Sequence, residues 1–310
     1  MSAANTHDSP VVAPSPKRLA RERRRATLSR FGQAYARHRA GMLGLAILAV
    51  FAAGALLAPL IFPSEMLDIT ETVDNEAMAA PSSEFWLGTD ENGRSVLAVL
   101  VWAARASLVV GISASLISMV LGTLIGISSG HYRGLVGGLL QRLTDWFLVI
   151  PFIPLVVVLA AVLGQRGLAA IVLVLGVTSW PGTARLVRAQ TLSVQARPYL
   201  ERARVLGGSD WHQMSRHILP NVMPLVLANT TLTVAIVILS ETTLSFLGLG
   251  DPYLDSWGSM LDKATSAGAA STGAWWYLLP PGICVILVVL AFTLIGRALE
   301  AVLDPRLRER

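Results

Sequence analysis

Residues 41–62 read GMLGLAILAVFAAGALLAPLIF, an apolar run that lies between Arg39 and Glu65. A helix needs about 20 mostly apolar residues to cross the roughly 30 Å hydrocarbon core of a bilayer. The run is long enough for this, and it therefore predicts a first membrane-spanning helix within residues 39–64.

Five further apolar stretches follow along the chain. Hydrophobic residues make up 53% of the 310 positions and charged residues only 15%, with a mean hydropathy of +0.58. Soluble domains average about 25% charged residues, so this composition excludes a soluble enzyme and a disordered chain. We predict an all-α polytopic membrane protein with six transmembrane helices. The five later spans are expected within 107–127, 146–164, 167–184, 216–251 and 263–297.

Prolines interrupt the third and fourth of these predicted spans. Pro151 and Pro154 lie in the third and Pro181 lies in the fourth. Proline is tolerated in membrane helices where neighbours satisfy the freed carbonyl groups. We therefore expect each stretch to cross the bilayer.

The basic residues indicate the orientation of the chain. Twenty-one of the 25 lysines and arginines lie in the N-terminal tail, in the second and fourth connections, or in the C-terminal tail. Cytoplasmic segments carry such an excess. Both termini are thus expected in the cytoplasm, with an acidic external loop at 65–95. We interpret residues 1–38 as a disordered basic tail near anionic lipid headgroups, with a regulatory partner site as the alternative, and 307–310 as a cytoplasmic C-terminus.

The connection at 198–220 reads PYLERARVLGGSDWHQMSRHILP. Pro198 suits the first position of a helix, and Gly207 suits the left-handed residue that follows one. Ser209 is a good N-cap for a second helix, with Asp210 beside its positive end. The stretch predicts a helix, a turn and a second helix, which would form a short rigid ridge able to enter a groove on a cytosolic partner.

This connection resembles the E-A-A-x3-G-x9-I-x-L-P loop of ABC-importer permeases. Glu201, Ala203 and Gly207 match its beginning, and the pair Leu219-Pro220 matches its end. The string GGSDWHQMSRHILPN at 207–221 is close to the form found in the peptide-importing branch. The sequence departs from the general pattern at two positions, which are Arg202 and His217.

Two further segments resemble the same branch. Residues 87–97, LGTDENGRSVL, are similar to L-G-T-D-x-x-G-R-D-V-L, with Ser95 in place of the usual aspartate. Residues 241–250, ETTLSFLGLG, are similar to E-x-x-L-S-F-L-G-L-G. The resemblance covers about 41–306. The matching residues that we expect to be structural in the external segment are Gly88, Thr89, Asp90, Gly93 and Arg94.

The chain is thus identified as resembling the C-type permease subunit of dipeptide, oligopeptide and nickel ABC importers. The resemblance implies the type I importer (MetI-like) fold, with a core permease domain at 96–306, and a location in the bacterial inner membrane. It implies a second, B-type permease subunit, two cytosolic ATPases or one fused ATPase, and an external substrate-binding protein as partners. Peptide is the favoured cargo, while a nickel chelate or a haem-like cargo stays open.

The resemblance also assigns a role to the ridge. Residues 201–214 would be the coupling helix that enters a cleft on one ATPase. The residues expected to take part are Glu201, Ala203, Gly207, Ser209, Asp210, Trp211, Leu219 and Pro220. Glu201 would most simply pair with a nearby arginine.

The chain has no G-x-x-x-x-G-K-[ST] phosphate loop, since its only lysines are Lys17 and Lys263. We therefore expect it not to be an enzyme by itself, to hold no cofactor or metal, and to bind no nucleic acid; partner ATPases would bind ATP and Mg²⁺. A channel or secondary transporter is the second hypothesis. An intramembrane enzyme is the third, because Ser128 lies in a G-x-S-x-G match, although small residues there favour close helix packing.

Three features allow two readings. Glu241, deep in the fifth span, is either a hydrogen-bonded structural group or part of the gate or pathway. His212 and His217 are five apart, which is not one face of an α-helix, so contact with an ATPase is favoured over metal binding. The run 275–277 is interpreted as an interfacial aromatic belt, with substrate contact as the alternative.

Overall fold

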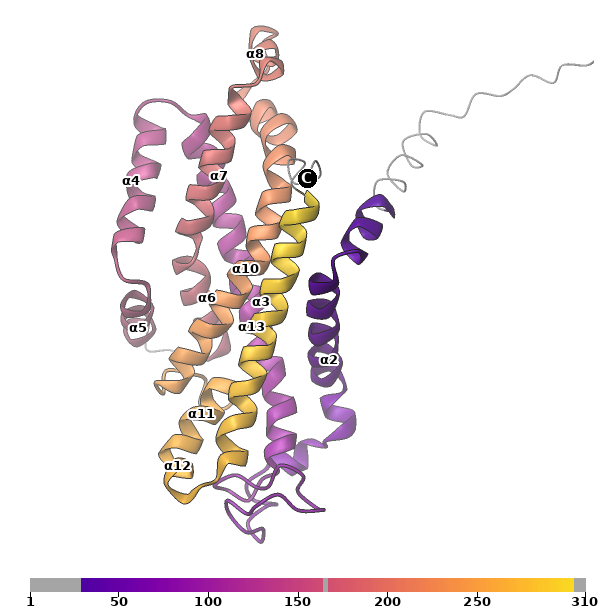
Figure 1. The fold of residues 1–310 in the computed structure, drawn as a ribbon. Helices are drawn as coiled ribbons and strands as arrows, with labels where there is room; N and C mark the ends of the chain where they lie inside the picture. Colours follow the sequence, from indigo (N-terminus) through magenta and orange to yellow (C-terminus); the bar gives the residue numbers. More distant parts are fainter. Residues whose placement is uncertain (1–28, 164–166, 304–310) are drawn as a thin grey trace, which may run out of the picture.

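The computed structural model describes residues 29–163 and 167–303, and these ranges are mostly helical and contain no β-strand (Figure 1). The longer helices are α2 (Arg39–Ile61), α3 (Val96–His131), α4 (Leu135–Val149), α5 (Phe152–Leu163), α6 (Leu168–Thr178), α7 (Trp180–Gln195), α10 (Leu219–Phe246) and α13 (Trp275–Leu303). The shorter ones are η1 (Ser64–Leu67), α8 (Pro198–Val205), α9 (Asp210–His212), η2 (Gln213–Ile218), α11 (Trp257–Ser266) and α12 (Ala269–Thr272).

Five helical segments of the described chain are long and apolar enough to cross a membrane. They are α2, α3, α6 with α7, the continuous helix 210–246, and α13. A sixth crossing is possible where α4 and α5 form a pair bent by 93°. The all-α polytopic architecture is confirmed.

The third predicted span is wrong as a single straight helix. Ile150 has an extended backbone, with φ −71° and ψ 127°, and the chain turns there. The residue before a proline avoids the α conformation, so Pro151 ends α4 and separates it from α5. Pro154 lies in the first turn of α5, and Pro181 lies in the first turn of α7, where a missing N–H costs no intrahelical bond.

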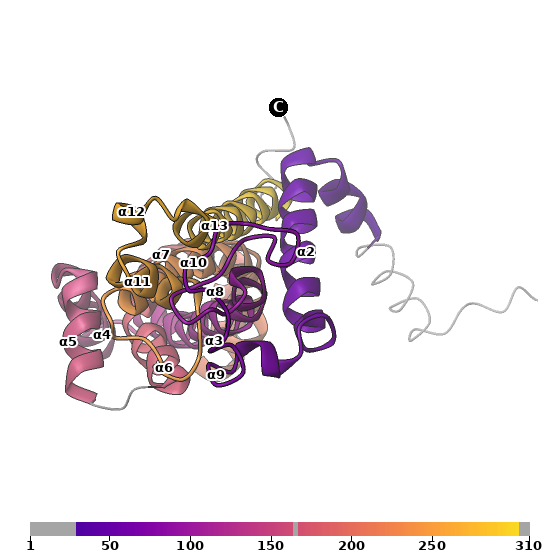
Figure 2. The ribbon, with the colours of Figure 1, turned by 90° about the horizontal axis from the view of Figure 1, so that it is seen from below.

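The helix α3 runs through the middle of the bundle and contacts α2, α6, α7 and α10 (Figures 1 and 2). Helix α8 projects beyond one end of the bundle, and the N-terminal end of α2 and the C-terminal end of α13 lie toward that same end. The 65–95 segment, α11 and α12 lie at the opposite end (Figure 1). The predicted topology requires this arrangement, with the termini and the 198–220 connection at one end and the 65–95 loop at the other.

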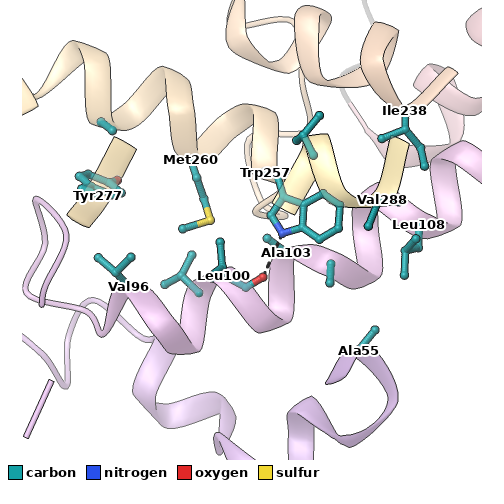
Figure 3. Close-up of a cluster of buried hydrophobic side chains, with 14 of the residues drawn as sticks. Ala55, Val96, Leu100, Ala103, Leu108, Ile238, Trp257, Met260, Tyr277 and Val288 are labelled. Atoms are coloured by element: carbon teal, nitrogen blue, oxygen red, sulfur yellow. Dashed lines mark hydrogen bonds between the residues drawn. The ribbon is translucent and has the colours of Figure 1, made fainter. Parts of the chain in front are cut away.

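A cluster around Trp257 holds the opposite end together (Figure 3). The fully buried indole donates from Nε1 to the Leu100 carbonyl oxygen at 3.1 Å, and it meets the ring of Phe51 edge-on. These contacts join α11 to α3 and α2. Helix α11 is not predicted by the sequence, because its apolar residues are too few to resemble a span.

Three glycines let α3 approach α7 closely. Gly122, Gly126 and Gly130 recur one turn apart on α3. A Cβ atom on each would lie 2.6, 2.7 and 2.8 Å from the Cβ atoms of, in turn, Thr183, Val187 and Thr191. The G-x-S-x-G match is therefore a helix-packing surface within α3, as small residues predict. It is not the strand-to-helix turn that a nucleophile elbow needs.

The described part of the N-terminal tail contains a short helix. Residues 29–36 are helical, and the buried Tyr35 donates from its hydroxyl to the Gly41 carbonyl oxygen at 3.2 Å. The ring packs against Ala298 of α13. The prediction of a disordered 1–38 tail is thus wrong for 29–36, because an aromatic anchor holds this turn of helix. Its remaining part, 1–28, and the predicted C-terminus, 307–310, lie outside the described residues.

The close α3–α7 contact generates a stability prediction. Gly126→Ala should lower the free energy of unfolding by about 1–3 kcal/mol, because the new methyl group overlaps atoms of α7. Thermal unfolding of the purified protein in detergent, followed by tryptophan fluorescence, measures the change. Gly138→Ala in α4 is the matched control, since its Cβ would meet nothing within 4 Å. Equal stability of the two variants would contradict the packing role.

Candidate functional site

Helix α8 is the first part of the candidate site. Pro198 begins it, as the sequence predicts. Leu200 is buried in one cluster with Val194 of α7 and Ile218 of η2. The helix therefore stands on an apolar base that belongs to the bundle, while its far end projects from the bundle (Figure 1).

The turn after α8 is a Schellman motif. Gly207 has φ +81°, a left-handed conformation that a residue with a Cβ rarely adopts. The Gly207 N–H donates to the Arg204 carbonyl oxygen at 3.0 Å, and the Gly208 N–H donates to the Ala203 carbonyl oxygen at 2.9 Å. These two bonds define the motif, and Ala203 supplies one of its carbonyls. The predicted left-handed cap is confirmed.

The second helix begins as predicted, with the Ser209 side chain accepting a bond from the His212 N–H at 3.3 Å. It then passes through the π-helix η2 into α10, in which Leu219 and Pro220 are the first two residues. Pro220 lacks an N–H, and the Leu219 N–H donates to the carbonyl oxygen of Met214, five residues back.

The π-helix corrects the reading of the two histidines. The rings of His212 and His217 lie edge to face with centroids 5.4 Å apart, although an α-helix would direct them to different faces. A π-helix has more residues per turn, so residues five apart come together. Together with Tyr199 and Arg202 they line a shallow hollow between α8 and the second helix.

The tip of the ridge is apolar and exposed. Val205, Leu206 and Trp211 are 82%, 87% and 72% exposed. A contiguous exposed apolar surface rimmed by polar residues indicates a protein interaction site. Glu201 is exposed and forms no ion pair within 29–163 and 167–303, so the expected arginine partner is absent there.

One contact of the ridge was missed by the sequence analysis. The Asp210 carboxylate lies 2.9 Å from Nε2 of His131 at the end of α3. Sequence reasoning placed Asp210 only at a helix N-terminus. A histidine 79 positions away gives no local signal.

Comparison with known proteins identifies the family. Residues 122–309, more than half of the chain, match the family of binding-protein-dependent transport system inner membrane components. The chain belongs to this family. Residues 28–81 of this permease also match the N-terminal transmembrane domain of oligopeptide transport permease C.

Individual relatives agree. A dipeptide transport system permease protein of Bacillus subtilis is 34% identical over 88% of this chain and 83% of its own length. A di/tripeptide transport system permease protein of Pseudomonas aeruginosa is 34% identical over 99% of this chain and 98% of its own length. A glutathione transport system permease protein of Pectobacterium atrosepticum is 35% identical over 74% of this chain and 75% of its own length. The permease is thus a multi-pass membrane protein of the type that the sequence resemblance implied.

The family motif at 87–97 of the permease folds around a buried ion pair. Arg94 Nε lies 2.7 Å from Asp90 Oδ2, and their side chains are only 6% and 1% exposed. Its Nη1 lies 3.1 Å from Asp255, which precedes α11. Burial alone would lower the pKa of Arg94, but Asp255 and Asp90 raise it above its usual value. The guanidinium is therefore a permanent charge that ties the 65–95 segment to the residue that precedes α11.

The other motif residues shape this segment. Gly88 and Gly93 have φ +65° and +74°. The Thr89 hydroxyl donates to the Glu76 carbonyl oxygen at 2.6 Å. Ser95 caps α3, because its side chain accepts from the Ala98 N–H at 3.4 Å. Serine at this position, in place of the aspartate usual in the family, therefore still serves as the N-cap.

Glu241 lies where three helices meet. It is 1% exposed and accepts hydrogen bonds from Ser245 at 2.8 Å and from Ser107 of α3 at 3.4 Å. The Ser107 hydroxyl oxygen also accepts from the backbone N–H of Trp257 at 3.3 Å. This geometry favours the hydrogen-bonded structural reading of Glu241.

The aromatic-belt reading of 275–277 is wrong for Tyr277. Trp275 is exposed, but Tyr277 is buried in the Trp257 cluster and donates from its hydroxyl to Glu91. A belt residue would face the bilayer interface. Tyr277 instead links α13 to the motif at 87–97.

The buried ion pair can be tested by substitution. Arg94→Met should lower the free energy of unfolding by about 3–5 kcal/mol, because it leaves the Asp90 carboxylate buried without its partner. Thermal unfolding of the detergent-solubilised protein measures the loss. Lys263→Met is the control: this lysine, 35% exposed, also pairs with Asp255, and its loss should cost at most about 1 kcal/mol. Losses of equal size would show that the buried ion pair of Arg94 stabilises the fold no more than the partly exposed pair of Lys263.

Proposed function

We propose that the chain is one of two permease subunits of an ATP-driven importer of di- and oligopeptides, and that it receives mechanical energy from a cytosolic ATPase through the ridge 198–217. The peptide cargo is supported by the three relatives, whose names specify dipeptides, di- and tripeptides, and glutathione. The ridge is supported by one observation above all. An apolar tip that is more than 70% exposed stands on a turn closed by a complete Schellman motif.

The proposed mechanism requires a stiff ridge. When two ATPases close on ATP, a cleft that grips Leu206 and Trp211 would carry the tip with it. The Schellman bonds hold α8 and the second helix at a fixed angle, so the ridge moves as one body. Leu200 and the continuous helix 210–246 then pass the displacement to α7 and α10, which lie in the bundle. Rocking of packed helices is an established form of such transitions.

The partners follow from this scheme. A second permease subunit would complete the pathway, two ATPases or one fused ATPase would bind ATP and Mg²⁺, and an external binding protein would deliver the peptide. The ridge faces the ATPases, so both termini lie in the cytoplasm. The 65–95 segment, α11 and α12 then face the binding protein.

The turn provides the sharpest test of coupling. Gly207→Val should lower peptide transport per ATP hydrolysed by about tenfold, because a β-branched residue resists the left-handed φ by roughly 1–2 kcal/mol. The effect is on the backbone alone, since a Cβ at Gly207 meets nothing within 4 Å. Uptake and phosphate release are measured together in proteoliposomes with the assembled complex. Gly207→Asn is the matched control and should retain most coupling, because asparagine tolerates this conformation. Full coupling in Gly207→Val would refute the ridge as the point of energy transfer.

Reconstitution tests the source of energy and the cargo. The chain alone in vesicles should accumulate no peptide, whereas the complex with its second permease, ATPase and binding protein should accumulate a labelled dipeptide in an ATP-dependent way. Uphill uptake by the lone chain would indicate a secondary transporter instead. Uptake of a nickel chelate or haem, with none of the dipeptide, would keep the importer and replace its cargo.

A further inference from the structure

His131 joins three segments that are far apart in the sequence. It is the last residue of α3, and its side chain is only 2% exposed. Nε2 lies 2.9 Å from Asp210 Oδ1 on the ridge, and Nδ1 lies 2.9 Å from Nε2 of Gln195, the last residue of α7. One imidazole thus touches the ends of two spans and the start of the second ridge helix.

The partners fix the direction of both hydrogen bonds. The Gln195 amide nitrogen can only donate, so Nδ1 of His131 accepts. In the neutral ring Nε2 then carries the proton and donates to the Asp210 carboxylate. A bond to an ionised acceptor is about twice as strong as one between neutral groups. The ring is also held in place by an edge-to-face contact with Tyr132, whose centroid is 5.3 Å away.

This is a distinctive connection of the ridge. Within the described residues, every other side-chain hydrogen bond of 198–217 stays inside the loop or reaches only into the first turn of α10. The other connections of the ridge to the bundle are the continuous helix 210–246 and the apolar cluster around Leu200, whose contacts are non-directional. A directed bond between buried His131 and Asp210 resists both rotation and translation of the ridge relative to α3.

We propose that His131 is a positioning residue for energy coupling: it fastens the ridge to the end of α3, so that displacement of the ridge is transmitted along this helix. The inference rests on the proposed function of the ridge. Helix α3 has 36 residues and spans about 54 Å at 1.5 Å per residue. Its opposite end begins at Val96, directly after the Arg94 ion pairs, and the Trp257 contacts to Leu100 and Ser107 follow within its first turns. A ridge fastened at His131 therefore acts on the external end of the bundle through a single helix.

Substitutions at both ends of the bond test the proposal. His131→Phe keeps a ring against Tyr132 but removes both hydrogen bonds, and it should lower peptide transport per ATP about tenfold. His131→Gln should restore most coupling, because its amide can donate to Asp210 and accept from Gln195. A purely structural role would lower assembly and stability without changing transport per ATP in the complexes that form. His38→Phe, at an exposed histidine outside the ridge, is the control and should match the unmodified protein.

A double-mutant cycle shows whether the bond itself carries the effect. Asp210→Ala should reproduce the loss in His131→Phe, and the double variant should be no worse than either single one, since both remove the same bond. Asp210→Asn keeps an acceptor oxygen and should retain coupling. Additive losses would overturn the proposal. If His131→Phe fails to assemble, the Asp210→Ala variant tests the same bond by changing its exposed partner. Unchanged coupling in Asp210→Ala also overturns the proposal.

The Gly207→Val variant separates this proposal from the one on which it rests. Loss of coupling in Gly207→Val with full coupling in His131→Phe would refute the His131 link and leave the ridge function standing. Full coupling in both would refute the ridge function itself.

Discussion

The long helix α3 is the constraint on which the rest of the structure depends. Apolar packing alone would let it slide, because lipid tails compete equally well for its surface. Glycines at one turn spacing bring α7 against the half of α3 that ends at His131, and directed polar contacts hold the two ends of α3. Arg94 and Ser95 precede its start, and His131 ends it. A helix held in this way is suited to the transmission of force that we propose.

The polar groups around Glu241 have one physical explanation. A buried polar atom costs several kcal/mol unless it is hydrogen-bonded, and lipid offers no partner. Where α10, α3 and α11 meet, the Ser107 hydroxyl therefore donates to Glu241 and accepts from the backbone N–H of Trp257. The same requirement makes the junction specific, because apolar residues there would tolerate several registers of the three helices.

The sequence predicted those features that depend on local chemistry. Apolar run length identified the spans, and glycine and serine preferences identified the turn at Gly207 and the cap at Ser209. It failed where backbone geometry or distant partners decide. Pro151 breaks a span that hydropathy presents as continuous, a π-helix brings His212 and His217 together, and no local pattern pairs His131 with Asp210. Long-range pairing is set by packing of whole helices, which a single sequence does not display.

The two ends of the bundle differ in the kind of contact they offer. The ridge presents an apolar tip that can bind and release a moving partner, since hydrophobic contact is non-directional. The opposite end instead uses buried charges, in which Arg94 pairs with Asp90 and Asp255. Breaking such pairs is costly, so this end holds its shape. A soft contact at the ridge and a rigid one at the other end suit the proposed scheme, in which a partner moves the subunit through the ridge.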